Sequence, residues 1–267
     1  MARFRALHEH GCFAIPNPWD PGTVRALESL GFQALATTSA GYAFTRGLPD
    51  AVDALSLEDV LAHQAEIAAA AQVPVNADFQ SGYADSPEGV AANVRRCVAT
   101  GVAGLSIEDA TPAGGLYEVG EAVARVRAAR EAIDETGTGV LLTARAEGFL
   151  YGVPDPLTQA IERLTAFSEA GADVLFAPGV REPGDIRAIV EAVAPKPVNV
   201  LMSTDTGLTL EDLAQLGVRR VSVGSALARV GWGAFLSAAR RIAAEGSFAG
   251  LGGAAPFPEL NELFSRS

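Results

Sequence analysis

Three short apolar segments of this chain each end in charged side chains. They occupy residues 73–78, 104–109 and 140–147, and the third carries Arg145 near its end. Parallel α/β proteins bury strands of this kind under helices and collect their functional groups at the C-terminal ends of the strands. We therefore expect a parallel α/β enzyme whose pocket is rich in carboxylates and contains an arginine.

Alternation of predicted strands and helices continues from one end of the chain to the other. Glycines follow several predicted helices, at Gly31, Gly101, Gly171 and Gly217, as expected of helix C-termini that lead into a strand. An open doubly wound sheet would place a glycine-rich turn after its first strand, and residues 15–21 contain no glycine. We therefore predict an α/β fold of the (β/α)8 TIM-barrel type. Its eight strands are expected at residues 12–15, 34–37, 73–78, 104–108, 140–145, 174–176, 198–201 and 221–223.

The helices between these strands begin at recognisable capping residues. Ser56 and Thr209 each stand three residues before an acidic residue, which is capping-box spacing, and Ser86 precedes a proline at the first helical position. The predicted helices begin near Pro21, Ser56, Ser86, Val119, Asp155, Glu182 and Thr209.

All 267 residues are expected to form one barrel domain, because barrels of this class reach roughly 250 residues as a unit. Residues 225–244 are predicted as a long helix, and residues 245–267 as a C-terminal linker and arm that ends in a short helix. A lone barrel would leave aromatic side chains of these segments exposed, so we expect a homodimer or homotetramer in which the arm packs on a neighbouring subunit. These side chains are Trp232, Phe235, Phe248 and Phe257.

Net charge and composition exclude several classes of partner. The formal net charge of −12 disfavours nucleic acid and anionic membrane surfaces, which bind clusters of Lys and Arg. The first nine residues lack the apolar core of a signal peptide, and no apolar run approaches the ~20 residues of a membrane span. We therefore expect a cytoplasmic protein. Cys12 and Cys97 have neither disulfide nor metal-ligand spacing and are predicted to be inert buried thiols.

The positions of lysine and histidine narrow the chemistry. The single lysine, Lys196, precedes a predicted strand and would lie at the end of the barrel opposite to catalysis, so a Schiff-base aldolase is disfavoured. His8, His10 and His63 lie before the first strand or within a helix. We expect them at the surface, and we predict no zinc site built from histidines.

Oxygen ligands remain at the expected catalytic end of the barrel. Asp50, Asp78, Glu108 and Asp109 are predicted there, with Asn76 beside them. Carboxylates and waters suit Mg²⁺ or Mn²⁺, which often bind through only one or two direct carboxylates. The alternative is that these acidic residues cap helices or pair with arginine.

An arginine and a small-residue segment could bind an anion at the same end. Arg145 can hold a carboxylate through two hydrogen bonds, and its alternative role is an internal salt bridge with Glu147 or Glu108. Residues 37–41 follow the second strand and offer hydroxyls and small side chains, so that backbone N–H groups can approach an anion closely.

Five short motifs occur in the order, and at the strand ends, in which a known family carries them. They are Ser39-Ala40-Gly41, Leu48-Pro49-Asp50, Asn76-Ala77-Asp78, Ile107-Glu108-Asp109 and Ala144-Arg145-Ala146-Glu147. They match that family's Ser-Gly-Gly carboxylate-binding turn, its Pro-Asp segment, its Asp-Ala-Asp metal motif, its Ile-Glu-Asp motif and its Ala-Arg-x-Glu motif. On these motifs the chain resembles the isocitrate lyase/phosphoenolpyruvate mutase superfamily from residue 17 to residue 225, nearly its whole length.

This resemblance implies a site and a chemistry. Members bind the 2-oxo-carboxylate part of a substrate or product on Mg²⁺, and make or break a C–C or C–P bond next to it. Family barrels commonly exchange their last helix between subunits of a dimer or tetramer, and the last helix here could do the same. The resemblance implies metal ligands at Asp78, Asp50, Glu108 and Asn76, catalytic roles for Arg145, Asp50 and Glu108, and substrate binding by Ser39, Ala40, Gly41, Arg145, Ser203 and Trp19.

The chain departs from the family pattern at three places. Residues 110–117 contain no Cys, His or Lys, whereas isocitrate and methylisocitrate lyases carry a Lys-Lys/Arg-Cys-Gly-His loop there. A proton would then come from water or from a loop residue such as Tyr117. Asn76 replaces the first Asp of the metal motif, and residues 177–178 are Ala-Pro where family lyases have a Glu.

These features favour a Mg²⁺-dependent carbon–carbon lyase. Its substrate would be a small di- or tricarboxylate, isocitrate-like or a substituted malate, and it would release a 2-oxo acid. Decarboxylation of a 2-oxo diacid such as oxaloacetate needs the same stabilised enolate and no cysteine, and it is the nearest alternative. Two further alternatives are phosphonopyruvate hydrolysis and non-catalytic binding of a 2-oxo acid.

Overall fold

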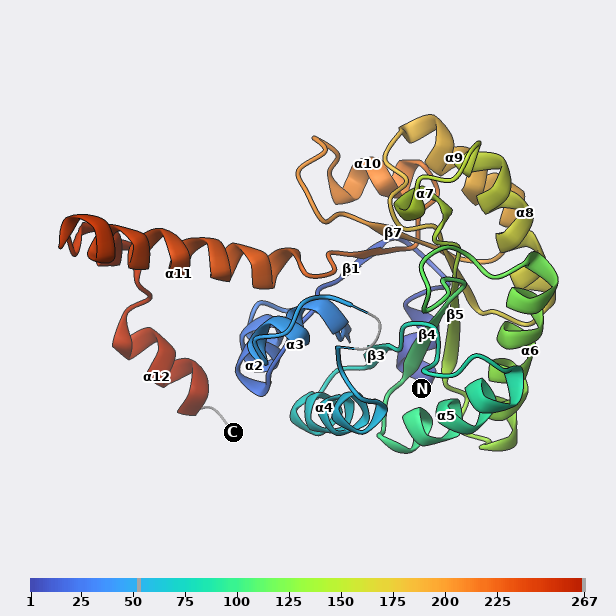
Figure 1. The fold of residues 1–267 in the computed structure, drawn as a ribbon, viewed down its shortest axis with the longest axis horizontal. Helices are drawn as coiled ribbons and strands as arrows, with labels where there is room; N and C mark the ends of the chain where they lie inside the picture. Colours follow the sequence, from blue (N-terminus) through green and yellow to red (C-terminus); the bar gives the residue numbers. More distant parts are fainter. Residues whose placement is uncertain (52–53, 266–267) are drawn as a thin grey trace.

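Eight parallel strands wind into a nearly closed barrel surrounded by helices (Figure 1). The computed structural model describes residues 1–51 and 54–265. Each strand pairs in parallel with its neighbours in the order β1-β8-β7-β6-β5-β4-β3-β2. The two edge strands approach each other where the Ala36 N–H donates to the Pro16 carbonyl (3.0 Å). The strands are β1 (Phe13–Ile15), β2 (Leu35–Ala36), β3 (Val75–Asp78), β4 (Gly104–Glu108), β5 (Leu141–Arg145), β6 (Val174–Phe176), β7 (Val198–Leu201) and β8 (Arg220–Ser222).

The predicted barrel is confirmed, and the helices begin where the capping residues indicated. Side-chain oxygens of Asp20, Ser56, Ser86 and Thr209 accept hydrogen bonds from backbone N–H groups in the first turn of their helices. Such bonds satisfy backbone N–H groups that the first turn of a helix leaves without partners. Because the capping residue lies next to these groups in the sequence, helix starts can be predicted from the sequence. The helices are α1 (Ala2–Ala6), α2 (Pro21–Ser29), α3 (Ser39–Thr45), α4 (Leu57–Ala70), α5 (Pro87–Ala99), α6 (Val119–Glu135), α7 (Gly148–Tyr151), α8 (Pro156–Glu169), α9 (Pro183–Val193), α10 (Leu210–Gln215), α11 (Ala226–Glu245) and α12 (Phe257–Ser265), with a 3₁₀ helix at Ala249–Gly253.

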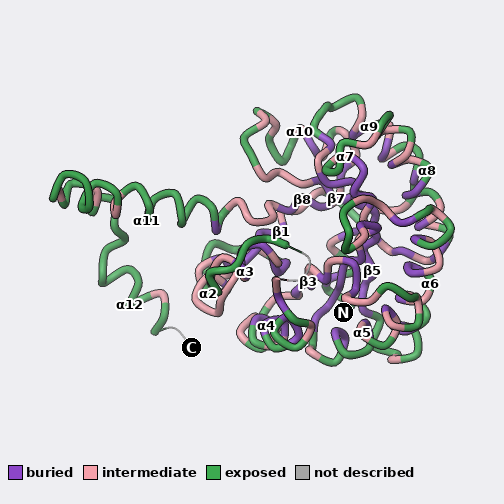
Figure 2. The backbone as a smooth tube through the Cα atoms, in the orientation of Figure 1, coloured by how far each residue is buried: buried purple, intermediate pink, exposed green. Residues whose placement is uncertain are grey.

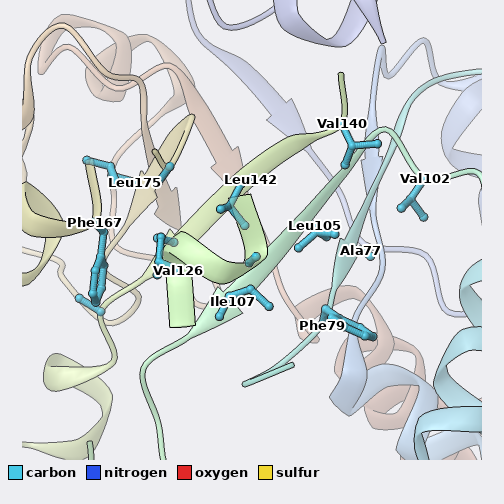
Figure 3. Packing of buried hydrophobic residues seen from close by; sticks show 14 of the residues in the cluster. Ala77, Phe79, Val102, Leu105, Ile107, Val126, Val140, Leu142, Phe167 and Leu175 are labelled. Carbon is cyan, nitrogen blue, oxygen red and sulfur yellow. The ribbon is translucent and has the colours of Figure 1, made fainter. Parts of the chain in front are cut away.

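The main hydrophobic core lies between the outside of the barrel and its helices. Leu105, Ile107 and Leu142 point outward from β4 and β5 and pack with Val126 of α6 and other buried side chains (Figure 3). Alternate residues of the same strands therefore face the barrel interior. Buried residues follow the strands, the outer helices combine buried and exposed residues, and the arm is mostly exposed (Figure 2).

The interior of the barrel is apolar at its floor and polar above. We use the word floor for the end at which the strands begin. There Phe4 of α1 packs with Ile15, Ala36 and Leu141 in a second buried cluster. Buried polar side chains lie along the strands: Asn76, Ser106, Thr143, Asn199, Arg220 and Ser222. These polar side chains lie just below the strand ends, where the site described next is found.

The C-terminal helices extend away from the barrel. Helix α11 projects outward, and α12 turns back toward α2 (Figure 1), where Arg25 Nη1 donates to the Phe264 carbonyl (3.2 Å). Only Ala228 of α11 is buried, while Phe235 and Phe257 are largely exposed. The arm expected at residues 245–267 thus includes a short final helix, and residues 266–267 lie outside the described part of the chain. In the described residues no helix is long and apolar enough to cross a membrane.

Two histidines and one cysteine differ from the prediction. His8 and His63 are buried, not at the surface, because each ring is held from inside the fold. A ring nitrogen of His8 bonds the Phe4 carbonyl (2.8 Å), and His63 bonds the Trp19 carbonyl (3.0 Å) while its ring stacks on Tyr42. Cys97 is buried as expected, whereas Cys12 is only half-buried.

Candidate functional site

The strand ends surround a cavity of about 350 Å³ inside the mouth of the barrel. The last residues of all eight strands line it, five of them from the consecutive strands β3 to β7. C-terminal strand ends are where parallel barrels place their chemistry. These five residues are Asp78, Glu108, Arg145, Phe176 and Leu201.

Arg145 forms the centre of a buried ion network in this cavity. Its Nη1 lies 3.1 Å from Asp78 Oδ1 and 2.8 Å from Glu108 Oε1, and its Nε lies 2.8 Å from Glu147 Oε1. Burial alone would lower the pKa of Arg145, but the carboxylates of Glu108, Glu147 and Asp78 outweigh it and raise this pKa. The internal pairing that the sequence left open for Arg145 is therefore present, with both predicted partners and a third.

Ser39 and Asp78 are joined at the start of α3. Asp78 Oδ2 accepts hydrogen bonds from the Ser39 backbone N–H (3.0 Å) and hydroxyl (2.9 Å). The backbone N–H of Gly41 donates to Thr38 Oγ1 (3.2 Å), which caps the helix. Residues 37–41 thus begin a short helix, and the Gly41 N–H serves that helix. Ser39 and Ala40 line the cavity, and Gly41 does not.

The carboxylates of the site carry more negative charge than Arg145 neutralises. Burial raises the pKa of Glu108, and the neighbouring carboxylates Glu147, Asp78 and Asp50 raise it further against the effect of Arg145. Burial, followed by Asp78, raises the pKa of Asp50. Burial also raises the pKa of Glu147. Four acidic side chains around one guanidinium favour the uptake of protons or of a cation.

The oxygen donors present suit a hard cation such as Mg²⁺. Asp50, Asp78 and Glu108 line the cavity, and Asn76 places a buried Oδ1 in its wall that has no hydrogen-bond partner. Among the described residues no three His, Cys, Asp or Glu side chains converge closely enough to hold an ion by themselves. The donor set therefore fits an ion that takes one or two protein carboxylates and completes its coordination with water and substrate.

Asp109 and Tyr117 lie behind the cavity and support it. Asp109 Oδ2 pairs with Arg163 (3.0 Å), and its Oδ1 accepts the backbone N–H of Glu147 (2.8 Å). Asp109 therefore fixes the position of Glu147. Tyr117 donates its hydroxyl to Asp85 (3.0 Å) and is not among the described residues that line the cavity, so the structure does not place this hydroxyl near the ion network.

Two expected substrate-binding residues also lie elsewhere. Trp19 lines a shallow apolar groove together with Trp232 and Phe235, outside the cavity at the strand ends. The carbonyl of Ser203 accepts a hydrogen bond from Arg229 (2.6 Å), and Ser203 is not among the described residues that line the cavity.

Several cavity residues were not identified from the sequence. Leu150 and Tyr151 come from α7, a four-residue helix that the sequence analysis did not predict. Four more are polar residues at alternating positions of short apolar strands, and that alternation is the signal that could have found them. They are Ser106, Asn199, Arg220 and Ser222.

Comparisons with known proteins agree on the kind of protein. The family model described as phosphoenolpyruvate phosphomutase matches residues 4–243. The 2-methylisocitrate lyase of Escherichia coli is 32% identical over 64% of this chain and 61% of its own length. An oxaloacetate decarboxylase of Paraburkholderia xenovorans is 32% identical over 82% of this chain and 73% of its own.

Solved structures give the same result. A Burkholderia cenocepacia protein provisionally described as a lyase/mutase superposes with a TM-score of 0.94, at 46% identity, over 99% of this chain and 95% of its own. A phosphonopyruvate hydrolase, solved as a complex with oxalate and Mg²⁺, superposes with a TM-score of 0.86, at 25% identity, over 99% of this chain and 94% of its own.

Proposed function

The chain belongs to the isocitrate lyase/phosphoenolpyruvate mutase superfamily, and we propose that it is a Mg²⁺-dependent carbon–carbon lyase. Its substrate is a small di- or tricarboxylate, isocitrate-like or a substituted malate, and its product is a 2-oxo acid. One observation carries the proposal: Arg145 joins Asp78, Glu108 and Glu147 at the strand ends that line the cavity. A 2-methylisocitrate lyase at 32% identity supports the reaction class.

The ion network prepares this cavity for a 2-oxo-carboxylate. Asp78 and Glu108, with Asp50 nearby, provide the oxygen donors for Mg²⁺, which when bound supplies Lewis-acid stabilisation of negative charge on the 2-oxo group. Arg145 lies between Asp78 and Glu108 and pairs with both, and its charge lowers the pKa of Glu108 against the larger effect of burial. Because three carboxylates fix its guanidinium, this positive charge is already in place when charge develops on the substrate.

A proton donor is still needed for the carbanion that bond cleavage leaves. No thiol can supply it, because Cys97 is fully buried outside the barrel and Cys12 lies at the floor, next to the start of β1. Tyr151 lines the cavity, and burial, followed by Glu108 and Glu147, raises its pKa so that the hydroxyl stays protonated. We assign to Tyr151, or to water beside it, the role that the sequence gave to Tyr117.

Decarboxylation of a 2-oxo diacid is the second candidate. It needs the same stabilised enolate and no thiol, and a decarboxylase of oxaloacetate is 32% identical over 82% of the chain. The absence of Cys, His and Lys from residues 110–117 favours it over ordinary isocitrate lyase chemistry.

Turnover measurements separate the candidates. Isocitrate, methylisocitrate, dimethylmalate, oxaloacetate and phosphonopyruvate are each incubated with the protein and Mg²⁺, and release of the 2-oxo acid or CO₂ is followed. We expect turnover of at least one acid, its loss in EDTA, and its loss in Asp78→Ala. Asp134→Ala, an exposed carboxylate on α6, is the matched control and should keep full activity. Ligand binding without turnover of any acid would contradict the proposal and leave a binding protein.

A further inference from the structure

A second arginine, Arg220, lies deep in the same cavity and has no role in the proposed reaction. Arg220 is the first residue of β8, whereas Glu108 and Arg145 are the last residues of their strands. Its side chain is buried, yet it lines the cavity. Its Nη2 donates to Thr143 Oγ1 (3.0 Å), and Thr143 stands two residues before Arg145 on β5. Arg220 therefore lies below the ion network, toward the floor of the barrel.

All the groups around Arg220 are neutral. Its Nε donates to Asn199 Oδ1 (2.8 Å), and its Nη1 faces His8 Nε2 (3.5 Å). The other ring nitrogen of His8 bonds the Phe4 carbonyl, which can only accept, so Nδ1 carries the hydrogen and Nε2 is a lone-pair acceptor. Burial, followed by Arg220, lowers the pKa of His8 to about 3, so this ring stays neutral.

The positive charge of Arg220 thus has no counter-charge. Among the described residues no carboxylate lies within ion-pair distance of Arg220, and the acidic groups of the site pair with Arg145. Burial lowers the pKa of Arg220 to about 9, which leaves the guanidinium charged at neutral pH. Buried charges are ordinarily paired, because water no longer solvates them. An uncompensated cation at the inner end of a cavity is suited to an anionic group of a ligand.

The cavity is therefore polarised along the barrel axis, negative at its mouth and positive toward its floor. We propose that Arg220 binds the second carboxylate of a short 2-oxo diacid whose 2-oxo-carboxylate end lies at the strand ends. Residues two apart on a strand are separated by roughly 6.6–6.8 Å, so the two levels are spaced for a chain of a few carbons. This inference rests on the proposed function, in which a 2-oxo acid binds at the strand ends, and it assigns to Arg220 the selection of ligands that carry a second carboxylate.

Equilibrium binding tests the inference without turnover. Calorimetry in the presence of Mg²⁺ compares 2-oxoglutarate with 2-oxopentanoate, which has the same five-carbon chain but lacks the second carboxylate. We expect the wild-type protein to bind the diacid at least tenfold more tightly. In Arg220→Gln the two affinities should become equal, with little change for the monoacid. Arg219→Gln, the same change on the neighbouring residue, whose Nη1 bonds the Gly11 carbonyl outside the cavity, should keep the preference.

Each outcome decides between the claims. Equal binding of both acids by the wild-type protein overturns the role of Arg220 and leaves the proposed function intact, whereas binding of neither acid overturns both. A preference that persists in folded Arg220→Gln shows that Arg220 only supports the barrel, since a structural role would lower stability and leave the affinity ratio unchanged. If circular dichroism shows that Arg220→Gln is unfolded, Arg220→Lys replaces it. Lysine keeps the charge but lacks the two parallel N–H donors of the guanidinium, so the preference for the diacid over the monoacid should fall at least threefold. An unchanged preference refutes the inference.

Discussion

Replacing Arg145 by methionine removes the only cation of the ion network at the strand ends. In the wild-type protein the side chains of Asp78, Glu108 and Glu147 are 17%, 16% and 3% exposed, and each lies within 3.1 Å of the Arg145 guanidinium. Removing one partner of a buried ion pair costs about 3–5 kcal/mol, because it leaves a charge that water does not solvate. For a chain of this size this corresponds to a fall in Tm on the order of 6–20 °C.

The cost in Arg145→Met should depend on pH. Burial already raises the folded-state pKa of Glu108 and Glu147, and loss of the guanidinium raises it further. The unfolded chain releases these protons near pH 4, so the folded state binds more protons above that pH, and its stability falls as pH rises through the folded-state pKa. We therefore expect Arg145→Met to be more strongly destabilised at pH 8 than at pH 5.5.

Urea unfolding at the two pH values measures the effect. Arg95→Met is the matched control, because Arg95 pairs with Glu135 at the surface, with side chains 46% and 60% exposed. Such a pair contributes about 0–1 kcal/mol. An Arg145→Met protein within about 1 kcal/mol of wild type at pH 8, or a loss equal at both pH values, would refute the electrostatic account of the site.

Three further predictions concern the assembly, the thiols and the metal. Light scattering at micromolar concentration should show a dimer or tetramer, because α11 and α12 expose Trp232 and other aromatic residues; a monomer would count against this. A Cys12→Ser/Cys97→Ser variant should keep its activity, and thiol alkylation should not inhibit the wild-type protein, since neither thiol lines the cavity. Loss of activity in a folded variant would mean that a thiol takes part in the reaction. The rise in Tm caused by Mg²⁺ should be larger at pH 8 than at pH 5.5, because the raised pKa values of Glu108 and Asp50 make protons compete with the ion at low pH. An equal rise at both pH values would place the ion elsewhere.

Local signals explain why most of the fold was predictable from the sequence. A helix start is decided by a few neighbouring atoms, so Ser56, Ser86 and Thr209 could be recognised as caps. Strands that are buried on both faces have long apolar runs, and their charged ends mark the mouth of the barrel. The side chains of Asp78, Glu108 and Arg145 were therefore expected together, and the structure brings them together.

The remaining differences depend on contacts between distant segments. His8 is buried because α1 packs against the barrel floor, and no nearby residue predicts that contact. Residues 39–45 are compatible with a turn or a helix, and packing decides between them. Trp19 and Ser203 follow strands, but the loops carry them away from the cavity. Arg220 was overlooked because the predicted strand began at residue 221, whereas β8 begins at Arg220 itself.

Binding of oxalate in the presence and absence of Mg²⁺ tests the central claim most directly. Oxalate resembles the enolate form of a 2-oxo acid, and calorimetry measures its binding without any turnover. We predict saturable binding of oxalate by the wild-type protein with Mg²⁺, and no measurable binding in EDTA or in Asp78→Ala. Equal affinity for oxalate in Mg²⁺ and in EDTA would show that the carboxylates at the strand ends do not hold an ion for a 2-oxo acid, and it would contradict the account of this site.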